Sequence, residues 1–214
     1  MLSIPLIKSL VSQASDIPGV LDSLQVPFQT ISHANWADSY PYCPDVKFRL
    51  AYNSLSLLLH FKVKEDAVRA VYGEDNGEVW TDSCVEFFSI PADDGIYYNL
   101  ECNCIGTVLL GAGLNREHRE RANQNTLGSI QRWASLGRKP FGEILQPTEW
   151  EVALILPYTA FFKHRIRRLE GNVVKANFYK CGDRLPQPHF LSWQPIALEK
   201  PNFHCPQFFG ELAF

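Results

Sequence analysis

The chain has 214 residues, a formal net charge of -3 at pH 7 and a pI near 6.1. This length suits one large all-β domain or two small domains, and the acidic balance argues against a polyanionic partner such as nucleic acid. Hydrophobic residues make up 46% of the chain and aromatic residues 13%, which predicts a well-supplied core and no disorder. No stretch approaches the roughly 20 apolar residues that a membrane span needs.

The N-terminal segment, residues 1–30, carries Pro5, Pro18, Gly19 and Pro27 between short apolar clusters. We expect it to be an extended segment that wraps the domain, with at most one short helix or strand. Its first dozen residues lack the basic start, the long apolar run and the cleavage site of a secretory signal. As written, the sequence therefore predicts a soluble, cytoplasmic protein. Removal of a leader would instead make the protein extracytoplasmic.

A hairpin is expected next. A loop rich in aromatic residues and proline, residues 32–44, leads into residues 46–52, and a second strand follows over residues 55–63. Apolar side chains occupy alternate positions in both segments, so each strand has one face for the core. Residues 66–72 are expected to form a helical turn.

The most informative stretch runs from Trp80 to Cys104, where two alternating runs flank a short turn rich in Pro, Asp and Gly, a pattern typical of a β-hairpin. Because side chains alternate across a strand, each run predicts two faces. One face is largely apolar, and the other is a polar and aromatic row formed by Trp80, Asp82, Cys84, Glu86, Tyr97, Asn99, Glu101 and Asn103. Such a row suits sugars, whose C–H faces pack on rings while their hydroxyl groups bond to amides and carboxylates. An ordinary solvated sheet face is the alternative.

The remaining chain continues the β pattern. The charged run over residues 114–122 is expected to be a solvated helix or loop, and Pro157 opens a short helix. Further strands are predicted over residues 106–113, 128–136, 150–156 and 174–181. These short strands predict an all-β fold, a β-sandwich with short peripheral helices. No linker interrupts the pattern, so we expect a single domain over residues 1–214.

Six cysteines could form disulfides in an oxidising compartment, but a chain of this size does not need them to hold a core. We expect most of them to be buried free thiols that pack as small hydrophobic residues. A zinc site built on Cys102 and Cys104 is the alternative, although structural zinc sites usually come as two pairs of ligands with wider spacing.

Five motifs follow one another along the chain: W-T-D-S-C-V-E-F-F from Trp80, Y-Y-N-L-E-C-N from Tyr97, A-N-F-Y-K-C-G-D from Ala176, H-F-L-S-W from His189 and F-F-G-E-L-A-F from Phe208. In this order they resemble the carbohydrate-binding module family 9-like proteins, a superfamily that includes the DOMON-type sugar and haem domains. The resemblance implies an antiparallel β-sandwich, jelly-roll-like or immunoglobulin-like, that binds an oligosaccharide or polysaccharide. In the characterised modules, two tryptophans sandwich the reducing-end sugar.

The resemblance also implies roles for single residues. Trp80 and Trp193 match the two tryptophans, and Glu86 matches a carboxylate that bonds to sugar hydroxyls. Asn99 and Glu101 stand where those modules carry an arginine and an asparagine, which leaves the sugar preference open. Together with Asn177, these are the residues expected to bind the ligand. Bound calcium is known in the family, and the acidic loop residues that could hold it are Asp93, Asp94 and Asp183.

Two other functions remain as alternatives. Glu86 and Glu101 share one face of neighbouring strands, and a glycoside hydrolase needs two carboxyl groups about 5–10 Å apart. Haem binding has little support, because Met1 is the only methionine and relatives use Met with His or Lys as axial ligands. We therefore expect a binding module without turnover and assign no catalytic residue. The sugar and the oligomeric state stay open.

Overall fold

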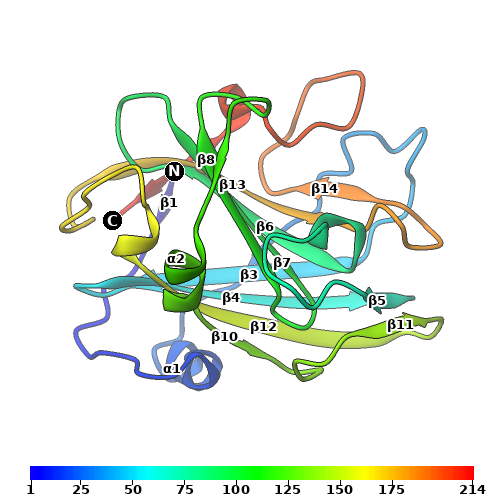
Figure 1. Cartoon of the computed structure of the whole chain (residues 1–214), viewed down its shortest axis with the longest axis horizontal. Helices are drawn as coiled ribbons and strands as arrows, with labels where there is room; N and C mark the ends of the chain where they lie inside the picture. Colours follow the sequence, from blue (N-terminus) through cyan, green and yellow to red (C-terminus); the bar gives the residue numbers. More distant parts are fainter.

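The computed structural model describes all 214 residues, and its strands form two large facing sheets and a third sheet of two strands (Figure 1). Sheet A has the order β1 (Leu2–Ser3), β15 (Gly210–Ala213), β13 (Val173–Cys181), β6 (Cys84–Ile90), β7 (Tyr97–Asn103), β8 (Val108–Gly113) and β9 (Glu120–Arg121), with β14 (Phe190–Ser192) paired to β13. Sheet B has the order β10 (Gln131–Ala134), β12 (Thr148–Pro157), β4 (Ser56–Glu65), β3 (Asp45–Tyr52) and β2 (Gln29–Thr30). Within both sheets every pairing except that of β1 with β15 is antiparallel, which confirms the predicted β-sandwich.

Helical elements are short and lie at the periphery, as predicted. Two are α-helices, α1 (Ile17–Ser23) and α2 (Gln124–Ser129). The others are single 3-10 turns: η1 (Ala14–Asp16), η2 (Val79–Thr81), η3 (Tyr158–Ala160) and η4 (Pro206–Phe208). None of these helices is long and apolar enough to cross a membrane.

The main core lies between the two sheets and contains 39 buried residues. Aromatic rings from both sheets meet at its centre, where Phe48 of β3 stacks on Phe178 of β13 with ring centroids 3.7 Å apart. Phe87 of β6 extends the stack at 4.9 Å from Phe178. These residues occupy the alternate positions that the sequence assigned to the core face, so burial of that face explains the register of the strands.

Both outer sheet faces are also covered. Helix α1 packs Ile17 and Leu21 on the outside of sheet B (Figure 1). The C-terminal segment over residues 196–209 packs on the outside of sheet A, where Phe203 stacks on Tyr179 with a centroid distance of 4.2 Å. The polar row of the central hairpin therefore does not form an open solvated face. Glu86 and Glu101 are only 3% and 4% exposed.

A buried charged network links the two sheets. Lys180 of β13 lies 2.9 Å from a carboxylate oxygen of Glu65 of β4, and both side chains are fully buried. The same ammonium group lies 2.7 Å from Nε2 of His189 and donates to the carbonyl of Cys181. Trp150 donates its indole N–H to the other oxygen of Glu65. Each charged group thus has the partners that burial of a charge requires.

Four local expectations were wrong. Residues 66–72 do not form a helical turn, because Val68–Ala70 is strand β5, which pairs with β11 (Phe141–Ile144) in a third small sheet. Trp80 lies in η2 rather than at the start of the hairpin strand. The predicted strand over residues 128–136 is shorter than expected, because α2 extends to Ser129 and β10 covers only Gln131–Ala134. The segment over residues 1–30 contains η1 and α1 as well as β1 and β2, and is therefore more regular than expected.

Candidate functional site

An open pocket of about 120 Å³ lies on the outer face of sheet A, beside the C-terminal segment. Strands β6, β7 and β13 supply its floor, η2 and the loop after β13 supply one wall, and the chain around β9 and the C-terminal segment supply the rest. It is lined by Trp80, Glu86, Glu101, Arg116, Arg119, Arg121, Cys181, Asp183, Phe190, Pro201, Asn202, Phe203 and His204. The pocket thus combines aromatic side chains with groups of both charges.

Two carboxyl groups face each other in this pocket. Glu86 of β6 and Glu101 of β7 are directly opposed in the strand register, which places both side chains on the same face of the sheet. Burial raises the pKa of Glu101 to about 7, and it raises the pKa of Glu86 well above its ordinary value, with the neighbouring Glu101 as a further cause. Glu101 accepts a hydrogen bond of 2.9 Å from Asn99 at Oε1, whereas its buried Oε2 has no hydrogen-bond partner. Burial without a partner leaves this oxygen with an unused capacity to form a hydrogen bond.

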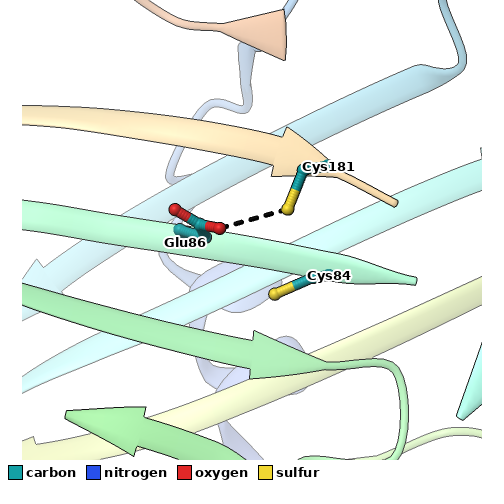
Figure 2. Close-up of side chains that lie close together, drawn as sticks. All are labelled: Cys84, Glu86 and Cys181. Carbon is teal, nitrogen blue, oxygen red and sulfur yellow. Dashed lines mark hydrogen bonds between the residues drawn. The ribbon is translucent and has the colours of Figure 1, made fainter. Parts of the chain in front are cut away.

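Two thiols lie next to Glu86 (Figure 2). Cys181 of β13 is directly opposed to Cys84 of β6, and its thiol donates to Glu86 Oε1 over 3.1 Å. Burial raises the pKa of the Cys84 thiol to about 12 and raises that of Cys181 well above its ordinary value, so both are neutral. Five of the six cysteines are buried and none is in a disulfide, as predicted.

Cys84, Glu86 and Cys181 are also the one group of three potential metal ligands, with donor atoms within 4.8 Å of one another. Two sulfur atoms and one oxygen suit zinc rather than calcium. The zinc alternative named Cys102 and Cys104, which lie outside this group. Asp94 accepts hydrogen bonds from His164 and from the backbone N–H of Ile96, whereas Asp183 lines the pocket. These two of the acidic residues considered for calcium therefore do not belong to one site.

Aromatic side chains border the carboxyl groups. Trp80 is half-buried in η2, and the backbone N–H of Asp183 donates to its carbonyl. Phe203 is fixed by its stack on Tyr179, and the hydroxyl of Tyr97 lies 2.9 Å from Nδ1 of His204. Burial lowers the pKa of His204 to about 3, so this imidazole is neutral at physiological pH. The aromatic walls are thus held by long-range contacts.

The structure brings three of the six expected ligand-binding residues into one pocket: Trp80, Glu86 and Glu101. Asn99 lies beneath them and donates to Glu101. Asn177 donates to the carbonyl of Gln194 and accepts from two backbone N–H groups, so its amide joins β13 to the chain after β14.

Trp193 does not line the pocket, so the two tryptophans are not paired across one space. Its ring packs edge-on against Phe48 and Phe178, at centroid distances of 5.8 and 5.7 Å. The backbone N–H of Trp193 donates to the carbonyl of Phe178. This register sends Trp193 to the inner side of sheet A, together with Phe178, while Glu86 lies on the outer side.

Several pocket residues were not expected from the sequence. Cys181, Phe203 and His204 had no local signature. The arginines Arg116, Arg119 and Arg121 stood out as one charged run, but a charged run alone predicts a solvated face. The pairing of Arg121 in β9 with Gly111 in β8 is what brings this run beside the pocket.

Comparisons with known proteins agree with the architecture. The family model described as "Carbohydrate-binding family 9" matches residues 15–214. A protein from Bacteroides uniformis ATCC 8492, described as a presumed carbohydrate-binding protein, has a crystal structure at 2.70 Å resolution. It is 49% identical, with a TM-score of 0.97 over 100% of this chain and 98% of that one.

More distant structures share the fold. A family 9 carbohydrate-binding module from Caldicellulosiruptor kristjanssonii in complex with glucose is 11% identical, with a TM-score of 0.59 over 99% of this chain and 94% of that one. A cellotriose complex of a module from the same organism is 12% identical, with a TM-score of 0.58 over 99% and 92% of the two chains. No curated protein matched the sequence. The family match over most of the chain shows that this protein belongs to carbohydrate-binding family 9.

Proposed function

We propose that the protein is a non-catalytic carbohydrate-binding module that recognises one end of a saccharide in the pocket beside Trp80. The observation that carries this proposal is the meeting of an accessible tryptophan with two opposed, buried carboxyl groups, one of which has an oxygen without a hydrogen-bond partner. Family membership and the sugar complexes of the two distant modules support it.

Each group has a separate task in this proposal. Trp80 packs against the C–H face of a sugar ring, and about 50 Å² of buried apolar surface contributes about 1 kcal/mol. Glu86 and Glu101 bond to ring hydroxyls, at about 0.5–1.5 kcal/mol net for each bond. Asn99 holds Glu101 in position. Asn177 and Trp193 act indirectly, by fixing β13 and the chain after β14. After the cost of association, the sum corresponds to a dissociation constant between micromolar and millimolar.

Titration calorimetry with glucose, cellotriose and xylotriose tests the proposal. Saturable heat is expected with at least one sugar, and Trp80→Ala should abolish it. Trp133→Ala is the matched control, because Trp133 is also half-buried but lies on β10 of sheet B. Equal binding by the wild type and Trp80→Ala would refute the assignment of this pocket. Reduced sugars, which have an open-chain alditol at one end, test the preference for a reducing end.

A glycoside hydrolase is the second candidate, because Glu86 and Glu101 form an opposed carboxyl pair with raised pKa values. Such an enzyme needs one carboxyl group protonated and the other ionised during the reaction. The release of new reducing ends from the sugars that bind would favour it, provided that Glu86→Gln and Glu101→Gln each abolish the release. Binding without release supports the module.

A further inference from the structure

Three arginines gather at the mouth of the pocket, in the chain that follows β8. Arg116 and Arg119 lie in the loop, and Arg121 lies in β9. Arg119 donates its Nε–H to the carbonyl of Arg116, which ties the two residues together. None of the three guanidinium groups forms an ion pair with a carboxylate of the protein, although Arg49, Arg69, Arg132 and Arg184 all do. These guanidinium groups can therefore form an ion pair with an anionic ligand.

The carboxyl groups of the pocket do not balance these charges. Burial raises the pKa of Glu101 to about 7 and that of Asp183 to about 6, and it raises the pKa of Glu86 well above its ordinary value. The raised pKa values reduce the negative charge that these carboxyl groups carry at pH 7, because each group keeps its proton to a higher pH than an exposed carboxyl group does. The three arginines carry three positive charges, and the neutral His204 adds none. Among the residues that line the pocket, positive charge is thus in excess, although the whole chain has a net charge of -3.

We infer that the saccharide bound by this pocket carries an anionic group, a carboxylate or a sulfate, which the arginines at the mouth bind while Trp80 and the two opposed glutamates hold the ring. This inference rests on the proposed function and names the ligand class of the same site. A guanidinium group presents its N–H donors in a planar fork that matches two oxygens of a carboxylate or sulfate.

Neutral sugars leave part of this arrangement without a partner. The ring hydroxyls of a neutral hexose can bond to Glu86, Glu101 and Asp183, but three adjacent cations would face only dipoles. Glucose and cellotriose, which occur in the complexes of the distant modules, are uncharged. The expected distinction of this chain is therefore a preference for an acidic sugar, such as a uronic acid at the end of an oligosaccharide.

Calorimetry with four ligands of the same ring size tests the inference: glucose, glucuronic acid, the methyl ester of glucuronic acid and glucose 6-sulfate. The methyl ester keeps the ring and removes the charge. We expect the wild type to bind glucuronic acid or the sulfate about tenfold more tightly than the ester or glucose, a preference that shrinks as sodium chloride screens the charges.

The variants Arg119→Gln and Arg121→Gln locate the effect. Each should weaken binding of the anionic sugar about tenfold and change binding of glucose less than threefold. Arg167→Gln, an exposed arginine outside the pocket, makes the same charge change and should leave every affinity unaltered.

The outcomes separate this inference from the proposed function. Binding of glucose that equals or exceeds binding of both anionic sugars would overturn the anionic preference and leave the carbohydrate-binding proposal standing. Preference for the anion without any loss in the two arginine variants would overturn the assigned residues. Absence of heat with all four sugars and with the neutral oligosaccharides would overturn both proposals.

Discussion

Replacement of Glu101 by glutamine is expected to stabilise the fold while weakening sugar binding. The carboxyl group has an ordinary pKa of 4.5 and a pKa of about 7 in the folded protein, chiefly because burial disfavours the charged form. Below pH 4.5 the group is protonated in both the folded and the unfolded chain and costs nothing. As the pH rises from 4.5 towards 7, only the unfolded chain loses its proton, so the folded state becomes progressively less stable.

The magnitude follows from the size of this shift. One pKa unit corresponds to about 1.4 kcal/mol, so the shift from 4.5 to about 7 makes the wild type up to about 3 kcal/mol less stable at pH 8 than a chain without the charge. Glu101→Gln removes the charge and keeps the oxygen that accepts from Asn99. The variant should therefore gain up to about 3 kcal/mol at pH 8 and little at pH 5.

Urea denaturation at pH 5 and pH 8 measures this difference through the shift in midpoint between the wild type and the variant. Glu143→Gln is the matched control, because Glu143 is exposed on β11 and should show no dependence of its effect on pH. The same stability difference at both pH values would refute the reasoning. The weaker binding of sugar by the stabilised variant would show that the carboxyl group is retained at a cost to stability.

Three further predictions concern packing and access. Lys180→Met leaves Glu65 buried without its counter-charge and should lower the free energy of unfolding, measured by urea denaturation, by about 3–5 kcal/mol. Lys175→Met, at an exposed position of the same strand, should change it by no more than about 0.5 kcal/mol. A small loss of stability for Lys180→Met would show that the network contributes little. Gly111→Ala should weaken sugar binding, because the added methyl carbon would lie 2.7 Å from Oδ1 of the buried Asn99, which positions Glu101. Gly142→Ala adds a methyl group in open space and should bind sugar normally. An unchanged affinity of the Gly111→Ala variant would show that Asn99 is not needed. A thiol reagent should label Cys43 alone of the six cysteines in the native protein and all six after denaturation, and labelling of Cys84 or Cys181 in native protein would contradict their burial.

Strand positions were predictable wherever one face of a strand is buried in the main core. The hairpin of β3 and β4 and the central hairpin of β6 and β7 show apolar residues at every second position, and the register follows from burying them. Strand β5 was missed because three residues hold no periodicity and its partner β11 lies about 70 residues away in the sequence. Long-range pairing overrode a local preference there.

The residues of the pocket were only partly predictable for the same reason. The side of the sheet that bears Glu86 and Glu101 could be read from alternation, but the cover over it comes from residues 196–209. Trp193 was assigned to the pocket because its motif matches, whereas the side of the sheet that it faces depends on how β14 pairs with β13. The motif identified the segment of the chain that contains Trp193, but the side of the sheet to which its side chain points depends on the strand register.

The chemistry of the pocket depends on this cover. An open sheet face would leave Glu86 and Glu101 hydrated and ionised, and the hydrogen bond from the Cys181 thiol to Glu86 would then have little effect. The aromatic segment around Phe203 and His204 instead removes water from the carboxyl groups and so raises their pKa. A carboxyl group that keeps its proton can donate a hydrogen bond to a ligand as well as accept one. Because the same burial reduces the negative charge of the pocket, it also leaves the arginines at the mouth with the excess positive charge that favours an acidic sugar.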